Sequence, residues 1–271
     1  MVEGRREGAR RTLAAALATV ALAAPAQEAR RDAPFITTPE EVVERMLALA
    51  GTGPGDFVVD LGSGDGRIVI AAARNFGARG LGVDIDSRLV TLSRENARRA
   101  GVAERVAFEE RDVFRTDLSG ATVVTLYLLP SLIDQLQPKL MEELRPGARI
   151  VTHAFPMTGW KPDRSERMRL SRRHEGQGDE STLYLWVVPA QARGLWQSAD
   201  WQLRIRQNYQ EIEVEGSAAG RPLEVREATL EGASIRFAGP GFSYRGRIAG
   251  GRISGELTRD GRAGPLDFSK D

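Results

Sequence analysis

The sequence predicts an α/β protein, in which a mostly parallel sheet flanked by helices precedes a small antiparallel β domain. Three observations lead to this prediction. A glycine-rich turn joins an apolar strand to an apolar helix between residues 58 and 74. Strand-like and helix-like segments then alternate as far as residue 188, which is typical of parallel sheets. Beyond residue 194, short alternating stretches punctuated by glycine predict an antiparallel meander.

Length and composition limit the class of protein. The chain has 271 residues, enough for one large domain and a small one. Hydrophobic residues make up 41% and charged residues 28%, as in ordinary globular proteins. The net charge of +1 gives no general attraction to nucleic acid, so we expect no nucleic-acid partner. No metal site is predicted, because the chain has no cysteine and its only histidines are His153 and His174.

The first 26 residues have the pattern of a secretory signal peptide. Four arginines precede an apolar stretch at residues 13–24, and Ala24-Pro25-Ala26 offers a cleavage site. The stretch is too short to span a membrane, so no transmembrane span is expected after signal removal. Residues 10–13 also resemble a twin-arginine signal, and we expect export, to the periplasm if the source is bacterial. The alternatives are a disordered leader, an uncleaved membrane anchor or a cytoplasmic location.

The large domain is expected to occupy residues 34–189 and to open with a helix. Residues 37–50 carry an apolar face at helical spacing. Thr38 is expected to be the N-cap, Pro39 to occupy the first turn, and Glu41 to close a capping box. Capping accounts for Thr38, and the alternative is that this threonine and its neighbour contact a bound ligand.

The segment VVDLGSGDGR, residues 58–67, is the most informative part of the chain. Its two valines predict the end of a buried strand, and residues 68–74 predict a buried helix. Between them Gly62, Gly64 and Gly66 let the backbone approach a ligand without interference from a Cβ atom. A strand, a glycine-rich turn and a helix together form a nucleotide-binding element of α/β sheets.

The spacing G-x-G-x-G differs from the G-x-G-x-x-G of dinucleotide folds, in which a pyrophosphate lies on the helix N-terminus. Asp60 and Asp65 would repel a pyrophosphate, but they suit a ligand with a cationic end, such as an α-amino group or a sulfonium. DLGSGDGR resembles the S-adenosylmethionine (SAM) loop of class I methyltransferases. This resemblance implies that the loop contacts SAM, through Asp60, Gly62, Ser63, Gly64, Asp65 and Gly66. The alternative is a glycine-rich turn that binds nothing.

Further acids stand near the ends of the next two predicted strands. Asp84 lies near the end of a strand at residues 80–85, where an acid accepts hydrogen bonds from ribose hydroxyls. The alternative is that Asp84 or Asp86 only caps the following helix, a role that suits Asp86 better. Asp112 falls near the end of a third strand at residues 105–114, and an acid here binds the adenine amino group in class I methyltransferases. The alternative for Asp112 is an ordinary turn residue.

The remaining elements continue the alternation of strands and helices. Expected in order are a helix at 87–100, a strand at 121–129, a helix at 131–144, a strand at 148–155 and an antiparallel pair at 168–173 and 182–188. The strand at 121–129 is expected to be buried on both faces, as in a parallel sheet, and to end at Pro130. Pro138 is expected to kink or break its helix.

The second domain is expected at residues 195–271, after a linker at 189–193. Its short alternating strands predict a small β sheet or half-barrel. Arginine and glutamate alternate along these strands and are expected to lie on a solvated face. The alternative is a binding surface for a polymer or a protein partner.

Three residues are candidates for chemistry at the strand ends. Methyl transfer requires a deprotonated nucleophile held close to the sulfonium methyl group. Tyr127 is a candidate for orienting an amine or hydroxyl, and the alternative is a core aromatic. His153 is a candidate general base, and the alternative is a hydrogen-bonded structural histidine. Trp160 either lines a substrate channel or packs its own loop.

Residues 34–188 as a whole resemble the seven-β-strand SAM-dependent methyltransferases. DLGSGDGRIVIAAA, the strand-four exit YLLP and GARIVTHAFPMTGW look like the mitochondrial lysine methyltransferases that act on ATP synthase subunit c and the adenine nucleotide translocase. The resemblance implies a Rossmann-like methyltransferase sheet with SAM as cofactor, bound by Asp60, Gly62, Gly64, Asp84 and Asp112. The export signal and the C-terminal β domain depart from this family, and Asp84 stands where many relatives have glutamate.

The predicted function is therefore that of a SAM-dependent methyltransferase, with a protein lysine side chain as a candidate acceptor. YLLP is not the N/D-P-P-Y exit that amino-methylating DNA and glutamine methyltransferases use. The first alternative is an enzyme that methylates nitrogen, oxygen or sulfur of a small molecule. The second is a catalytically inactive binding protein that acts through the β domain.

Overall fold

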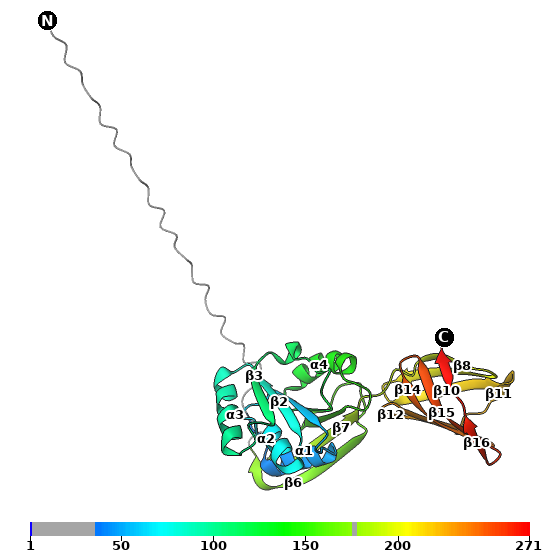
Figure 1. Ribbon diagram of the computed structural model, residues 1–271. Coiled ribbons are helices and arrows are strands. Elements are labelled where there is room, and N and C mark those ends of the chain that lie inside the picture. Colours follow the sequence, from blue (N-terminus) through cyan, green and yellow to red (C-terminus); the bar gives the residue numbers. More distant parts are fainter. Residues whose placement is uncertain (2–35, 175–177) are drawn as a thin grey trace.

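A computed structural model describes Met1, residues 36–174 and residues 178–271. The predicted signal peptide lies outside these residues, apart from Met1. The described chain folds into a helix-flanked sheet followed by a separate β sheet (Figure 1). Within the described ranges, no helix has the length and apolar character needed to cross a membrane.

The first sheet has seven strands in the order β3-β2-β1-β4-β5-β7-β6. Its strands are β1 Phe57–Leu61, β2 Arg79–Asp84, β3 Val106–Glu110, β4 Val123–Leu126, β5 Arg149–His153, β6 Arg164–His174 and β7 Gly178–Val187. The first five in sequence pair in parallel, and β7 runs antiparallel to both of its neighbours. The predicted α/β sheet with a final antiparallel pair is confirmed, although that pair is longer than predicted.

Helices cover both faces of this sheet (Figure 1). They are α1 Glu40–Leu49, α2 Arg67–Phe76, α3 Ser87–Arg99 and α4 Pro130–Glu143, with a 3₁₀ turn, η1, at Val113–Arg115. Side chains alternate along the central strands, because successive residues of a strand point to opposite faces. Val58 packs into the core under α1 and α2, whereas Val59 packs into the core under α4.

The predicted start of α1 is wrong. The helix begins at Glu40 after Pro39, and no side chain caps it. The Thr38 hydroxyl lies 3.1 Å from Nδ1 of His153, and the Glu41 carboxylate accepts hydrogen bonds from the backbone N–H and the hydroxyl of Ser171. The capping box fails because β5 and β6 offer both residues partners that a local pattern does not reveal.

The predicted kink or break at Pro138 does not end α4, which runs unbroken to Glu143. Proline removes one backbone hydrogen bond from a helix interior. The helix still forms because Ile133, Leu136 and Leu140 are buried against the sheet. Tertiary packing therefore outweighs the local cost of the proline.

The second sheet is antiparallel, with ten strands in the order β11-β10-β9-β8-β17-β15-β14-β13-β12 and β16 paired to β15. They are β8 Gly194–Ser198, β9 Trp201–Asn208, β10 Glu211–Ala218, β11 Arg221–Leu223, β12 Glu227–Glu231, β13 Ser234–Gly239, β14 Phe242–Ala249, β15 Arg252–Arg259, β16 Arg262–Pro265 and β17 Phe268–Lys270. The sheet curls around an aromatic core that includes Trp196, Phe237 and Phe268, and its ends approach each other between β10 and β12. The predicted half-barrel is confirmed.

Residues 189–193, predicted to be a linker, are held by hydrogen bonds. The Ala190 N–H donates to the Gly232 carbonyl at 2.8 Å, and the Ala192 N–H donates to Oε1 of Gln207 at 2.7 Å. Both alanines are buried. The connection is therefore packed against the β sheet that follows it.

Replacing Gly66 with alanine is expected to destabilise the fold. Gly66 has a φ of +82°, and a Cβ atom there would lie 2.7 Å from the Phe108 ring and 2.8 Å from Cβ of Ser93. The strained φ and the overpacking should together lower the free energy of unfolding by about 2–4 kcal/mol, measured by urea denaturation. Gly101→Ala is the control, because Gly101 has a φ of +71° but open space around it. Equal losses in the two variants would contradict the packing argument.

Candidate functional site

A cavity of about 610 Å³ opens at the carboxyl ends of β1 to β4. This volume is in the range of small-molecule and cofactor sites. The predicted residues that line it are Asp60, Gly62, Ser63, Gly64, Asp65, Asp84, Asp112 and Tyr127. Gly66 and His153 are not among the lining residues. Gly66 instead packs its bare Cα against the Phe108 ring.

The glycine-rich loop is held against β2 by backbone hydrogen bonds. The N–H groups of Gly62 and Ser63 both donate to the Val83 carbonyl at 2.9 Å. Gly62 has a φ of +85°, and a Cβ atom there would lie 2.8 Å from Cδ2 of Leu128. The conformation of the loop therefore favours glycine at this position, and the missing Cβ leaves room for the Leu128 side chain.

Asp84 is oriented by the backbone. Its carboxylate accepts hydrogen bonds from the N–H groups of Gly64 and Asp86, each at 2.9 Å. Asp86 caps α3 by accepting from the Arg88 N–H at 3.0 Å, as predicted. Asp84 is thus fixed on the cavity wall while its neighbour caps the helix, and its contact with a ribose remains a prediction.

Asp112 combines two features that the sequence treated as alternatives. β3 ends at Glu110, earlier than predicted, and Asp112 caps η1 by accepting from the Phe114 N–H at 2.9 Å. The same residue lines the cavity beside Val113. A capping role therefore leaves Asp112 at the site, where its contact with adenine remains a prediction.

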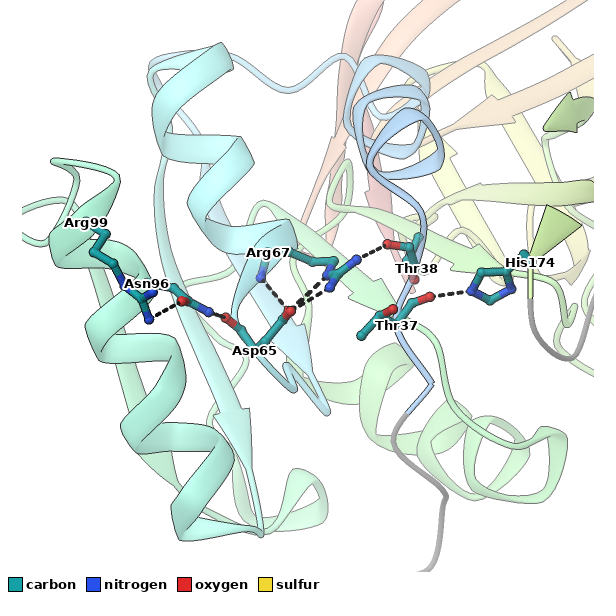
Figure 2. A network of polar contacts seen from close by, with 7 residues as sticks. All are labelled: Thr37, Thr38, Asp65, Arg67, Asn96, Arg99 and His174. Atoms are coloured by element: carbon teal, nitrogen blue, oxygen red, sulfur yellow. Dashed lines mark hydrogen bonds and ion pairs between the residues drawn. The ribbon is translucent and has the colours of Figure 1, made fainter. Parts of the chain in front are cut away.

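Asp65 is paired with an arginine that the sequence analysis did not single out. Arg67 donates from Nε to Oδ1 of Asp65 at 2.9 Å and from Nη2 to Oδ2 at 2.6 Å, so the charge of this carboxylate is largely offset (Figure 2). Nη1 of Arg67 also donates to the Thr38 carbonyl at 2.9 Å. On the other side, Nε2 of His174 donates to the Thr37 carbonyl. In the sequence, Arg67 stands two residues after Asp65, and this short spacing could have predicted the ion pair.

Residues 36–38 therefore form a strap along the cavity. Ile36, Thr37 and Thr38 all line it, and the strap is tied to the glycine-rich loop by Arg67 and to β6 by His174 (Figure 2). Ligand contact is the alternative that the sequence leaves open for the two threonines. The structure places both of them on the cavity.

Asp60 is the electrostatic centre of the site. Its side chain is buried at the end of β1, and the Thr125 hydroxyl donates to Oδ1 at 2.7 Å. Burial raises the pKa of the Asp60 carboxyl to about 7, and repulsion from Asp84 and Asp65 adds to the shift, against the opposing hydrogen bond from Thr125. A cation bound beside this carboxyl would restore its charged form.

The residues of the cavity fit SAM. The lining holds five carboxylates against two guanidiniums, which suits a ligand with cationic groups: Asp60, Asp65, Asp84, Asp86 and Asp112 against Arg67 and Arg111. The buried Ser63 hydroxyl has no hydrogen-bond partner among the described residues, and buried polar groups are normally paired. A polar ligand in the cavity would supply that partner.

The two candidate catalytic residues lie one behind the other. Tyr127 lines the cavity, and the ring of His153 packs 4.2 Å from it, centroid to centroid. His153 is fully buried, with Nδ1 3.1 Å from the Thr38 hydroxyl and Nε2 2.6 Å from the Ser181 hydroxyl. This placement favours the alternative of a structural histidine.

Trp160 also lies away from the cavity lining. It is buried in the loop between β5 and β6, and its carbonyl accepts from Nε1 of Trp186 at 2.9 Å. The placement favours the alternative in which Trp160 packs its own loop.

Comparison with known proteins gives matches to methyltransferases. The family model "ANTKMT methyltransferase domain" matches residues 60–164. A protein-lysine N-methyltransferase of Saccharolobus islandicus is 39% identical over 57% of this chain and 93% of its own length. The adenine nucleotide translocase lysine N-methyltransferase of Mus musculus is 38% identical over 49% of this chain, which spans 58% of the mouse protein.

A solved structure resembles part of this chain. It is described as an RNA methyltransferase from Salinibacter ruber in complex with S-adenosyl-L-homocysteine. Its sequence is 50% identical, with a TM-score of 0.53, over 58% of this chain and 95% of that chain. The likeness extends to a protein that holds the demethylated form of SAM.

Asp60→Asn is expected to stabilise the ligand-free protein at pH 8. A carboxyl with a raised pKa contributes stability at low pH, and that stability is lost as the pH rises from about 4 to about 7. Asparagine carries no charge and can still accept from Thr125, so the variant should gain about 3–4 kcal/mol at pH 8 and little at pH 4. Urea denaturation at both pH values measures this, and a pH-independent difference would refute the buried-charge argument.

The same variant is expected to bind SAM weakly. Protonation of Asp60 competes with a bound cation, so the affinity of the unaltered protein should fall by up to tenfold per unit below about pH 7. Calorimetric titration should show this dependence, which asparagine removes. Asp163→Asn is the control, because Asp163 also has a raised pKa, caused mainly by burial, but does not line the cavity. Unchanged SAM affinity in Asp60→Asn would show that the site is elsewhere.

Three observations indicate a SAM-dependent methyltransferase: the seven-stranded sheet, the acidic cavity beside its glycine-rich loop and the named relatives. SAM is the cofactor, and when bound it supplies an electrophilic methyl group on a sulfonium. The chain belongs to the family of SAM-dependent methyltransferases that carry the ANTKMT methyltransferase domain.

Proposed function

We propose that the protein transfers a methyl group from SAM to the amino nitrogen of a lysine side chain in a protein acceptor. Relatives from Saccharolobus islandicus and Mus musculus are named lysine N-methyltransferases. The chain spans little more than half of the mouse protein, so its acceptor is inferred from the cavity as well as from the names.

The observation that carries the proposal is the apolar side of the cavity. The acidic residues come from the ends of β1, β2 and β3, whereas Ile36, Tyr127, Leu128 and Leu132 line the side next to β4 and the strap. Three of these side chains are aliphatic, and Tyr127 adds one hydroxyl group. This side suits the aliphatic chain of lysine, and apolar surroundings favour the neutral amine over the ammonium ion.

The proposed reaction needs little from the protein beyond binding and orientation. The amine lone pair forms a new N–C bond to the methyl carbon while the C–S bond breaks and the sulfonium becomes a thioether. The nitrogen loses one proton to water. Tyr127 is the residue we expect to orient the amine, because its side chain lines the apolar side and is braced by the ring of His153.

We also propose that the protein is exported. The support is the arginine-rich start, the apolar stretch at residues 13–24 and the A-x-A site at residues 24–26. In the native cells, N-terminal sequencing of the protein from the exported fraction should give a new end near residue 27. Recovery of the full-length chain from the cytoplasm alone would refute the proposal.

Lysine methylation is expected to be detectable with a generic acceptor. With SAM labelled in its methyl group, label should enter poly-L-lysine at a rate that rises between pH 7 and pH 9, because lysine reacts as the neutral amine and its usual pKa is about 10.4. Acetylated poly-L-lysine is the matched control and should remain unlabelled. Label entering RNA or small amines, with none in poly-L-lysine or lysine peptides, would overturn the proposal.

A further inference from the structure

The second sheet reaches the first unit through the tip of the β9–β10 hairpin. Tyr209 lies at this tip, and its hydroxyl accepts a hydrogen bond from Nε2 of Gln137 in α4 at 2.7 Å. Its ring stacks on Trp160, with centroids 5.0 Å apart and planes 7° from parallel. Gln210 adds two bonds, accepting from Nε1 of Trp160 and donating to the Lys161 carbonyl, both at 2.7 Å. The tip thus joins α4 to the loop between β5 and β6.

Tyr209 occupies a position that glycine would fill more easily. Its φ is +53°, in the left-handed region that is costly for bulky residues. Nε2 of Gln207 donates to the Tyr209 carbonyl at 2.7 Å and to the Ala190 carbonyl at 2.9 Å, which holds the tip in this conformation. The strained backbone conformation therefore occurs at Tyr209, the residue whose side chain contacts α4 and Trp160.

The helix that Tyr209 contacts has a weak point beside the contact. Pro138 follows Gln137, and it cannot donate the hydrogen bond that the Asp134 carbonyl would otherwise accept. Contacts from outside the helix brace the turns around Pro138. The Asp134 carboxylate accepts from the N–H of Thr158 at 3.0 Å and from its hydroxyl at 2.9 Å, and Gln137 is bonded to Tyr209.

The orientation of α4 bears directly on the cavity. The helix begins at Pro130, two residues after Leu128, which lines the cavity. Leu132, in the first turn of the helix, also lines the cavity. Both leucines belong to the apolar side, whereas the acidic residues come from other strands. A tilt of α4 would therefore move the side proposed for the acceptor more than the cofactor side.

We propose that Tyr209 is a positioning residue for methyl transfer, which fixes the proline-containing helix α4 and thereby the acceptor side of the cavity. The β sheet that carries Tyr209 then serves as a brace for the methyltransferase unit. This inference rests on the proposed function, because it assigns the apolar side of the cavity to the acceptor. SAM binding, which depends on the other strands, should be independent of Tyr209.

The test compares Tyr209→Ala and Tyr209→Phe in the full-length chain. Tyr209→Ala should speed backbone hydrogen exchange at residues 131–137 and lower kcat for poly-L-lysine by about ten- to a hundredfold, because small misplacements are costly in methyl transfer. Its KM for SAM and its calorimetric SAM affinity should not change. Tyr209→Phe keeps the ring stack and should recover most of the loss. Asp260→Ala is the matched control, since Asp260 has a φ of +50° at the β15–β16 tip.

The outcomes separate this inference from the acceptor assignment. Unchanged exchange in α4, or a loss of SAM affinity that parallels the loss of kcat, would overturn the positioning role. If Tyr209→Ala does not fold, hydrogen exchange of α4 in Tyr209→Phe decides the question. The exchange rate should rise modestly if Tyr209 positions α4, because the bond to Gln137 is lost. An unchanged rate would overturn the positioning role. If the unaltered protein methylates RNA or small amines but neither poly-L-lysine nor lysine peptides, the lysine proposal fails, and exchange in α4 still decides the role of Tyr209.

Discussion

The site is organised around one carboxylate that the fold removes from water and that has no cationic partner within residues 36–174 and 178–271. Asp60 is buried at the end of β1, where it accepts a hydrogen bond from the neutral hydroxyl of Thr125. Arg67, the guanidinium that lines the cavity close to the loop, is bonded to Asp65 instead. The fold thus places a negative group in a cavity whose lining fits a cationic ligand, and the ligand-free protein is less stable than a neutral residue at this position would make it.

Much of this site could be predicted because its signals are local. The glycine spacing, the acids near the ends of three successive strands and the alternation of elements all lie in short stretches of sequence, and the parallel sheet brings the strand ends together. Asp60, Asp84 and Asp112 line one cavity for this reason. The cap at Asp86 could be predicted in the same way, since its partner is two residues away.

The predicted capping box has the opposite character. Thr38 and Glu41 match a capping pattern, but their partners lie 115 and 130 residues away in sequence. The choice between a base and a structural role for His153 also depends on distant residues, because its place in β5 puts it behind Tyr127. The contact of Tyr209 with α4 had no sequence signal, because it depends on how a second sheet docks.

The strap joins parts of the chain that are far apart in sequence, and this has a consequence for folding. Thr37 is held by His174, a separation of 137 residues, so its place depends on the pairing of the edge strand β6. Closing so long a loop is entropically costly, and such contacts are expected to form late. A nascent chain that ends before β6 would carry the whole glycine-rich loop and the Arg67 contact with the strap, but it would lack the contact with His174. The strap would then reach its final position only when the edge strand of the first sheet is in place.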